Sequence, residues 1–178
     1  MLKFAPYSFS RISTHKQCPR KFKYSYVDDV KVPFVYSEPL MKGGAVHHIL
    51  EHHPELSTHK HQAKYQHIAD KFLETDLARE IMMYERKVEL DIGLTAELKP
   101  CAYGSKEAMF RGSIDCMFYN ETTKTMVLVD WKTGKLREPK WQSFDQLMYY
   151  AIYMFIKYPK LNNIMISYVF VEHENAEN

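Results

Sequence analysis

The sequence predicts an α/β fold with a central mixed β-sheet flanked by helices. Apolar residues recur at helical spacing over residues 59–86, and stretches of strand length follow between residues 88 and 132. A second helical pattern at residues 140–158 precedes a last apolar stretch at residues 163–171. Helices, three strands, a helix and a strand in this order indicate one α/β domain. We therefore expect a single domain over residues 1–178, a length sufficient for a substantial core.

The first part of the chain has the pattern of helices. Residues 8–27 predict two short helices, with Pro19 in the first turn of the second, where its missing N–H costs nothing. Residues 28–37 predict a loop. A helix is expected from about residue 40 to residue 53, before Pro54. With residues 59–86, these segments predict a helical region that precedes a sheet-helix core at residues 87–171.

The core contains three predicted strands before its long helix. Residues 88–94 and 108–119 alternate between apolar and polar, the period of a strand with one buried face. Residues 125–132 (TMVLVDWK) are apolar on both faces at their centre, which is typical of a central strand. On the helix 140–158 we expect a buried stripe of Phe144, Leu147, Ala151, Phe155 and Tyr158, and a stripe facing away from it of Gln146, Tyr150, Tyr153 and Lys157.

Two strands each bring a carboxylate to a shared location. Asp115 ends the tetrad GSID, and Asp130 opens DWKTG. The short turn between these strands predicts a hairpin, so the two carboxylates lie side by side. Asp130 and Lys132 project on one face because strand residues two apart do so. Close carboxylates repel unless a cation lies between them, and oxygen ligands favour Mg²⁺ or Mn²⁺.

The segment GGAVHHILEHH at residues 43–53 is a second source of metal ligands. His48 to His52 is a formal match to the H-x-x-E-H zinc-peptidase signature, which needs a third ligand from a later helix. His47 and Glu51 form a different pair, four residues apart on one helix face. The segment therefore predicts a zinc peptidase, a different metal site, or a helix surface rich in histidine.

Composition limits the partners and the cellular compartment expected of the protein. The net charge of +2 permits a nucleic-acid partner through a local patch without demanding one. Three cysteines without a C-x-x-C pair argue against a disulfide scaffold and indicate a reducing compartment. The sequence has no apolar run of membrane-spanning length, so we expect a cytoplasmic protein without membrane partners.

Five segments in order resemble the PD-(D/E)XK nucleases, specifically the RecB-like exonuclease branch, which is related to CRISPR-associated, phage and mitochondrial exonucleases. They are SFSRISTHKQCPRKFKYSYV, GGAVHHILE, GSID, VDWKTGK and QLMYYA, between residues 8 and 151. The resemblance implies a restriction-endonuclease-like core. It also implies that His47, Asp115, Asp130 and the backbone carbonyl of Trp131 bind the metal, that Lys132 is catalytic, and that Gln146 and Tyr150 lie near the substrate.

The resemblance implies an Mg²⁺- or Mn²⁺-dependent deoxyribonuclease acting on linear DNA or single-stranded ends. Glu51, one turn after His47, is expected to support the site. A basic and aromatic N-terminal segment predicts backbone contacts to DNA from Arg11, Arg20 and Lys21. The expected setting is DNA recombination, repair or replication, with a helicase, single-strand-binding or recombination protein as possible partner.

The sequence departs from some of these relatives at its cysteines. Relatives with an iron–sulfur cluster use four cysteines, whereas here only Cys18 matches and no cysteine follows Cys116. We therefore expect no cluster and interpret Cys18 as a helix-cap or core residue. The chain ends soon after the last predicted strand, which suggests a compact viral version, acting in the host cytoplasm, or a fragment. A catalytically silent nucleic-acid-binding relative is the main alternative function, and the zinc peptidase a more remote one.

Overall fold

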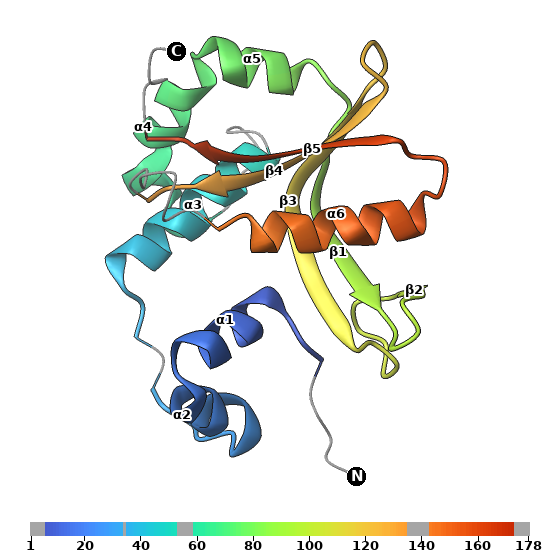
Figure 1. Ribbon diagram of the computed structural model, residues 1–178. Coiled ribbons are helices and arrows are strands. Elements are labelled where there is room, and N and C mark those ends of the chain that lie inside the picture. The colour runs from blue at the N-terminus through green and yellow to red at the C-terminus, as the bar shows by residue number, and fades with distance from the viewer. Residues whose placement is uncertain (1–5, 34, 53–58, 135–142, 173–178) are drawn as a thin grey trace. The chain divides into compact units, whose positions relative to one another are not determined.

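A mixed sheet runs through the computed structural model, which describes residues 6–33, 35–52, 59–134 and 143–172 (Figure 1). Its strand order is β2-β1-β3-β4-β5. The strands are β1 (Lys87–Leu94), β2 (Pro100–Cys101), β3 (Phe110–Asn120), β4 (Thr125–Lys132) and β5 (Asn163–Phe170). β3 and β4 are antiparallel, and β4 and β5 are parallel. The mixed sheet predicted from the sequence is therefore confirmed.

The helices also follow the predicted order. They are α1 (Phe9–Gln17), α2 (Pro19–Phe22), a π-helical turn (Lys23–Val27), α3 (Glu38–His52), α4 (Gln62–Leu73), α5 (Asp76–Met82) and α6 (Asp145–Lys157). Cys18 is the N-cap of α2, and its Sγ accepts from the Lys21 amide at 3.4 Å. This confirms the interpretation of Cys18 as a helix cap. Residue 53 and residues 140–142, which were predicted to be helical, lie outside the described residues.

The predicted helix 59–86 is divided into α4 and α5. Thr75 interrupts it, because its hydroxyl oxygen accepts from the Ala78 amide at 3.2 Å and caps the first turn of α5. A threonine side chain that satisfies an otherwise unpaired amide starts a new helix. The prediction of helical structure in this segment was therefore right, and the prediction of one continuous helix was wrong.

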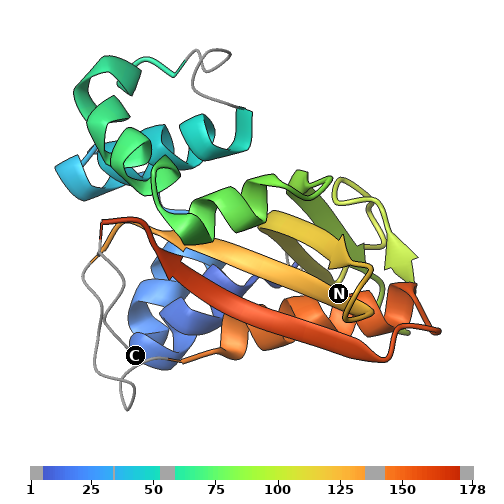
Figure 2. The same cartoon turned by 90° about the horizontal axis from the view of Figure 1, so that it is seen from above.

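The chain forms two compact units. The first contains residues 1–35, 91–113 and 145–161, and the second contains residues 36–90, 114–144 and 162–178. In the second unit, α3, α4 and α5 lie on one side of β4 and β5 (Figure 2). Their apolar side chains form a core with alternate residues of the strands: Cys116, Phe118, Val127, Val129, Trp131 and Val169.

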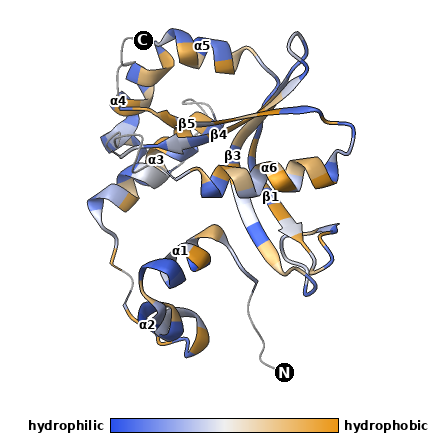
Figure 3. Ribbon diagram, in the orientation of Figure 1, coloured by the Kyte–Doolittle hydropathy of each residue, from blue (hydrophilic) through white to orange (hydrophobic). Residues whose placement is uncertain are grey.

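Within the first unit α1 contacts α6, and Lys16 Nζ lies 3.2 Å from Asp145 Oδ2. α6 is hydrophobic over most of its length (Figure 3). The predicted faces of α6 are partly wrong. Leu147 is buried and Lys157 is exposed as predicted, but Phe144 and Phe155 are exposed whereas Tyr150 and Tyr153 are buried.

A glycine explains why Tyr150 can be buried. A Cβ atom at Gly112 on β3 would lie 2.6 Å from Tyr150 Cε1. The tyrosine ring therefore occupies space that the missing side chain leaves over the strand. Helical spacing alone cannot reveal this contact, which pairs residues far apart in the sequence.

No helix among the described residues combines the length and the apolar character that crossing a bilayer requires.

Candidate metal centre

The β3–β4 hairpin supplies the two aspartates of the candidate site. Paired residues run from Asn120↔Thr125 to Cys116↔Val129, and the same register places Asp115 opposite Asp130. The backbone amide of Trp131 donates to Asp115 Oδ2 at 2.9 Å. The Asp115 carboxylate is thus held by the neighbouring strand where the two aspartates meet.

Helix α3 brings a histidine and a glutamate to the same place. Ala45, Val46, Ile49 and Leu50 are buried in the core and fix the rotation of the helix about its axis. A Cβ atom at Gly43 would lie 3.4 Å from Thr133 Oγ1, so the helix passes close to the end of β4. His47 and Glu51 follow Gly43 at intervals of four residues and therefore share its face.

The ligand atoms of these groups lie close enough together to bind one metal ion. His47 Nδ1 is 3.5 Å from Asp115 Oδ2 and 3.9 Å from Glu51 Oε1. One ligand atom from each of His47, Glu51 and Asp115 lies within 4.8 Å of the other two. An imidazole nitrogen and two carboxylate oxygens in this arrangement fit a divalent cation.

Burial and mutual repulsion raise the carboxylate pKa values of this cluster. The pKa of Glu51 is raised to about 8, first by burial and then by the charges of Glu89 and Asp115. The pKa of Asp115 is raised to about 6, first by burial and then by Asp130. His47, the Trp131 amide and Lys132 oppose this second shift. Anionic groups crowded away from water fit a bound cation, because its charge relieves both costs.

Lys132 lies beside this cluster at the end of β4. Its Nζ forms an ion pair with Asp130 Oδ2 and lies 4.8 Å from the ring centre of Tyr168 on β5. Tyr168 is paired with Asp130 in the parallel register, and its hydroxyl donates to the Ser143 carbonyl at 3.0 Å. The ammonium is therefore positioned by a carboxylate on its own strand and by a ring on the next strand.

Sequence reasoning missed Glu89 and Tyr168. Glu89 lies on β1 with a φ of 44°, a left-handed backbone that is uncommon for glutamate, and its carboxyl hydrogen-bonds with that of Glu51. The polar positions of residues 88–94 were a signal for Glu89. Tyr168 had no such signal, because the local sequence does not determine the register between β4 and β5.

The residues predicted to contact DNA belong to the first unit. Arg11 is half-buried and lies over the Tyr26 ring, with 4.7 Å between Cζ and the ring centre. Arg20 and Lys21 are exposed on α2. On α6, Gln146 Nε2 donates to the hydroxyl of the buried Tyr150 at 3.0 Å.

The H-x-x-E-H signature is divided between two helix faces. The carboxylate of Glu51 lies near His47, whereas the rings of His48 and His52 stack on each other with their centres 4.2 Å apart. In a zinc peptidase of this signature, the glutamate must serve the zinc that both histidines hold. The arrangement here gives that interpretation no support.

A sheet hairpin with two aspartates and a D-x-K lysine, beside a helix that adds histidine and glutamate, defines a metal-dependent nuclease of restriction-endonuclease-like fold. The model of the PD-(D/E)XK nuclease superfamily matches residues 6–178, and the chain belongs to this superfamily. Its class of activity is accordingly metal-dependent phosphodiester hydrolysis on a nucleic acid. No curated protein matches the chain significantly.

Proposed function

We propose that the protein is an Mg²⁺- or Mn²⁺-dependent DNA exonuclease of the RecB-like branch. The observation that carries this proposal is the meeting of His47, Glu51 and Asp115 next to the Asp130–Lys132 pair. Every position of the site bears a reactive side chain, which favours a nuclease over the catalytically silent alternative.

The roles follow from the contacts. His47, Asp115, Asp130 and the Trp131 carbonyl would hold the metal, and Glu51 would support it from the buried side. A divalent ion bound there supplies Lewis acidity, which lowers the pKa of water and neutralises phosphate charge. Lys132, which Asp130 and Tyr168 orient, presents an ammonium that stabilises the charge developing on the phosphate.

DNA contacts are assigned to the first unit. Arg20 and Lys21 are exposed and can neutralise phosphates. Because Tyr150 is buried, we propose that it orients Gln146, and that the Gln146 amide contacts the strand. This modifies the expectation that Tyr150 itself lies near the substrate.

The proposal also covers the substrate, the cellular process and the location of the protein. We propose action on linear or single-stranded DNA ends in recombination, repair or replication, with a helicase or single-strand-binding protein delivering the substrate. We place the protein in the cytoplasm, where its free thiols, including that of buried Cys116, stay reduced.

The test uses end-labelled linear DNA and covalently closed circular DNA with Mg²⁺, with Mn²⁺, or with chelator. We expect metal-dependent loss of the linear substrate only. Asp130→Asn and Lys132→Met should abolish digestion, whereas Lys124→Met, which removes an exposed lysine of the hairpin turn, should retain it. Equal digestion by wild type and both site variants would refute the site.

Three further outcomes separate the alternatives. DNA binding without cleavage under either metal would favour the silent relative. Cutting of circular DNA would make the enzyme an endonuclease with the same site. Zinc-dependent hydrolysis of a peptide by a protein that leaves DNA intact would restore the peptidase interpretation.

A further inference from the structure

Helix α3 carries a second set of metal-binding side chains on the face next to His47. Residues 44, 48 and 52 follow one another at intervals of four, as residues 43, 47 and 51 do, and the two rows are about 100° apart around the helix. His48 and His52 stack on this second face. The row therefore presents two imidazoles that take no part in the nuclease site.

A third imidazole reaches this face from the residues before α4. The His59 ring centre lies 5.7 Å from that of His48, and a Cβ atom at Gly44 would lie 3.6 Å from His59 Nε2. His61 follows, with its ring centre 5.8 Å from that of His59. Two imidazoles on one zinc ion have ring centres roughly 5 Å apart, because each Zn–N bond is about 2.0–2.1 Å. The donor nitrogens of His48, His52 and His59 do not all lie within 4.8 Å of one another, as the donor atoms of the carboxylate site do, so these rings must turn to share one ion.

The hydrogen bond of His52 orients its ring as a metal ligand. His52 Nδ1 lies 3.1 Å from the His48 carbonyl oxygen. A carbonyl only accepts, so Nδ1 carries the proton and the lone pair is on Nε2. Metal-binding histidines commonly donate their second N–H to a carbonyl in this way.

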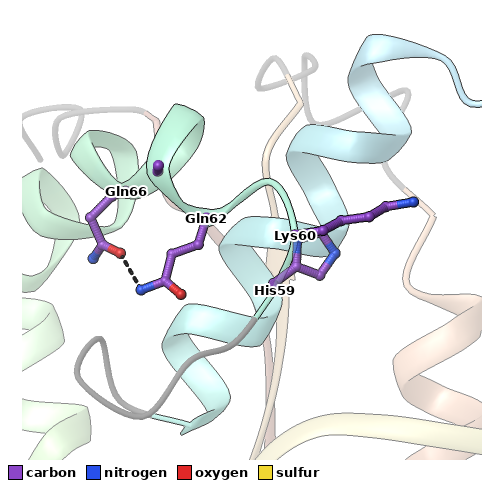
Figure 4. Close-up of a pocket in the computed structure, with 5 residues that line it drawn as sticks. His59, Lys60, Gln62 and Gln66 are labelled. Atoms are coloured by element: carbon purple, nitrogen blue, oxygen red, sulfur yellow. Dashed lines mark hydrogen bonds between the residues drawn. The ribbon is translucent and has the colours of Figure 1, made fainter.

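A hydrogen bond from the backbone two residues on holds the His59 ring. The His61 amide donates to His59 Nδ1 at 3.2 Å. Coordination through Nε2 requires the ring proton on Nδ1, so the metal bond replaces this hydrogen bond. His59 and Lys60 also border an open pocket of about 500 Å³ beside α4, with Gln62, Ala63 and Gln66 (Figure 4). An ion in solution therefore has access to the His59 side of the cluster.

We propose that His48, His52 and His59 form a second metal site, selective for zinc-like transition-metal ions and separate from the carboxylate site. Three nitrogen donors suit Zn²⁺, Co²⁺ or Ni²⁺ and suit Mg²⁺ poorly. His61 can supply a fourth ligand. The bound ion joins the end of α3 to the start of α4 and so stabilises the helix that carries His47 and Glu51. The site stands independently of the proposed DNA exonuclease activity.

The experiment titrates Zn²⁺ into the full chain with Mg²⁺ in excess, followed by calorimetry and thermal unfolding. We expect saturable binding and a rise in melting temperature of about 5–10 °C at a zinc concentration 100 times Kd. His52→Gln and His59→Gln should each weaken zinc binding about tenfold or more. His67→Gln, which changes an exposed histidine of α4 outside the cluster, is the matched control and should bind as wild type does.

Asp115→Asn provides the reciprocal control, because it alters the carboxylate site alone. The proposal requires this variant to keep zinc binding, and the Co²⁺-loaded protein to show an absorption spectrum of nitrogen coordination that His52→Gln removes. Loss of zinc binding in Asp115→Asn, with wild-type binding in His52→Gln and His59→Gln, would overturn the proposal. So would the absence of saturable zinc binding when Mg²⁺ is present. Circular dichroism of each metal-free variant verifies folding.

Discussion

Metal binding at the carboxylate site should be strongly coupled to proton release. A proton on Glu51 or Asp115 competes with the ion for the same oxygen atoms. With a pKa of about 8, the ionised fraction of Glu51 rises about fiftyfold between pH 6 and pH 8. With a pKa of about 6, that of Asp115 rises about twofold. The apparent Mn²⁺ affinity should therefore increase about 100-fold, or about 2.7 kcal/mol, over this interval.

Glu51→Gln isolates the larger contribution. The amide cannot bind a proton in this range, so the pH dependence should fall to about the twofold effect of Asp115. Calorimetric titration of Mn²⁺ at pH 7, in two buffers with different ionisation enthalpies, counts released protons. We expect about one more proton from wild type than from Glu51→Gln. Equal pH slopes and equal proton counts in the two proteins would refute the assignment of Glu51 to the metal site.

The same pKa shifts predict the stability of the metal-free protein. Both carboxyl groups have a higher pKa in the folded chain than in the unfolded chain, so the folded state binds more protons. Their contribution to the free energy of unfolding is most favourable below the unfolded values and declines as pH rises through about 6 and about 8. The melting temperature of chelator-treated protein should thus fall from pH 6 to pH 8.5. Mn²⁺ should reverse the fall, and a melting temperature that rises with pH would contradict the cause given for both shifts.

Three other pairs of substitutions test the positioning of the site and the packing of the fold. His47→Ala should lower metal-dependent DNA digestion about 100-fold or more, whereas His52→Ala in Mg²⁺ should change it little, as timed digestion would show. Tyr168→Ala should lower turnover about tenfold by freeing the lysine beside it, and Tyr168→Phe, which keeps the ring, should restore it in single-turnover assays. In urea unfolding, Gly112→Ala should lose about 1–3 kcal/mol through its clash with a buried ring, whereas Gly43→Ala, with its 3.4 Å contact, should change stability by less than about 1 kcal/mol.

Sequence alone could locate the parts of the site that depend on short-range structure. Asp115 and Asp130 are joined by one hairpin, so alternation and a turn sufficed to place them together. His47 and Glu51 share a helix face at a spacing of four residues, which fixes their relation without any tertiary information. The meeting of helix and hairpin came from the family resemblance.

The parts that sequence missed depend on contacts between distant segments. Tyr168 reaches Lys132 through a parallel register, and Tyr150 is buried because Gly112 lacks a side chain. The division between α4 and α5 had a local signal in Thr75, which periodicity concealed because the apolar spacing continues across the break. Periodicity shows which residues can face a core. The residues that pack against them from distant segments decide which of them are buried.

The electrostatics of the carboxylate cluster connect the fold to its function. Glu51 and Asp115 are kept close together and away from water by an apolar core that α3, β3 and β4 share. In the metal-free chain this arrangement raises both pKa values and lowers stability at neutral pH. A mobile cluster would relax by separating its charges, whereas a helix seated on buried alanine, valine, isoleucine and leucine side chains prevents that relaxation. The core therefore preserves a repulsive arrangement that a divalent cation relieves, and the same rigidity holds Lys132 beside the place where phosphate charge develops.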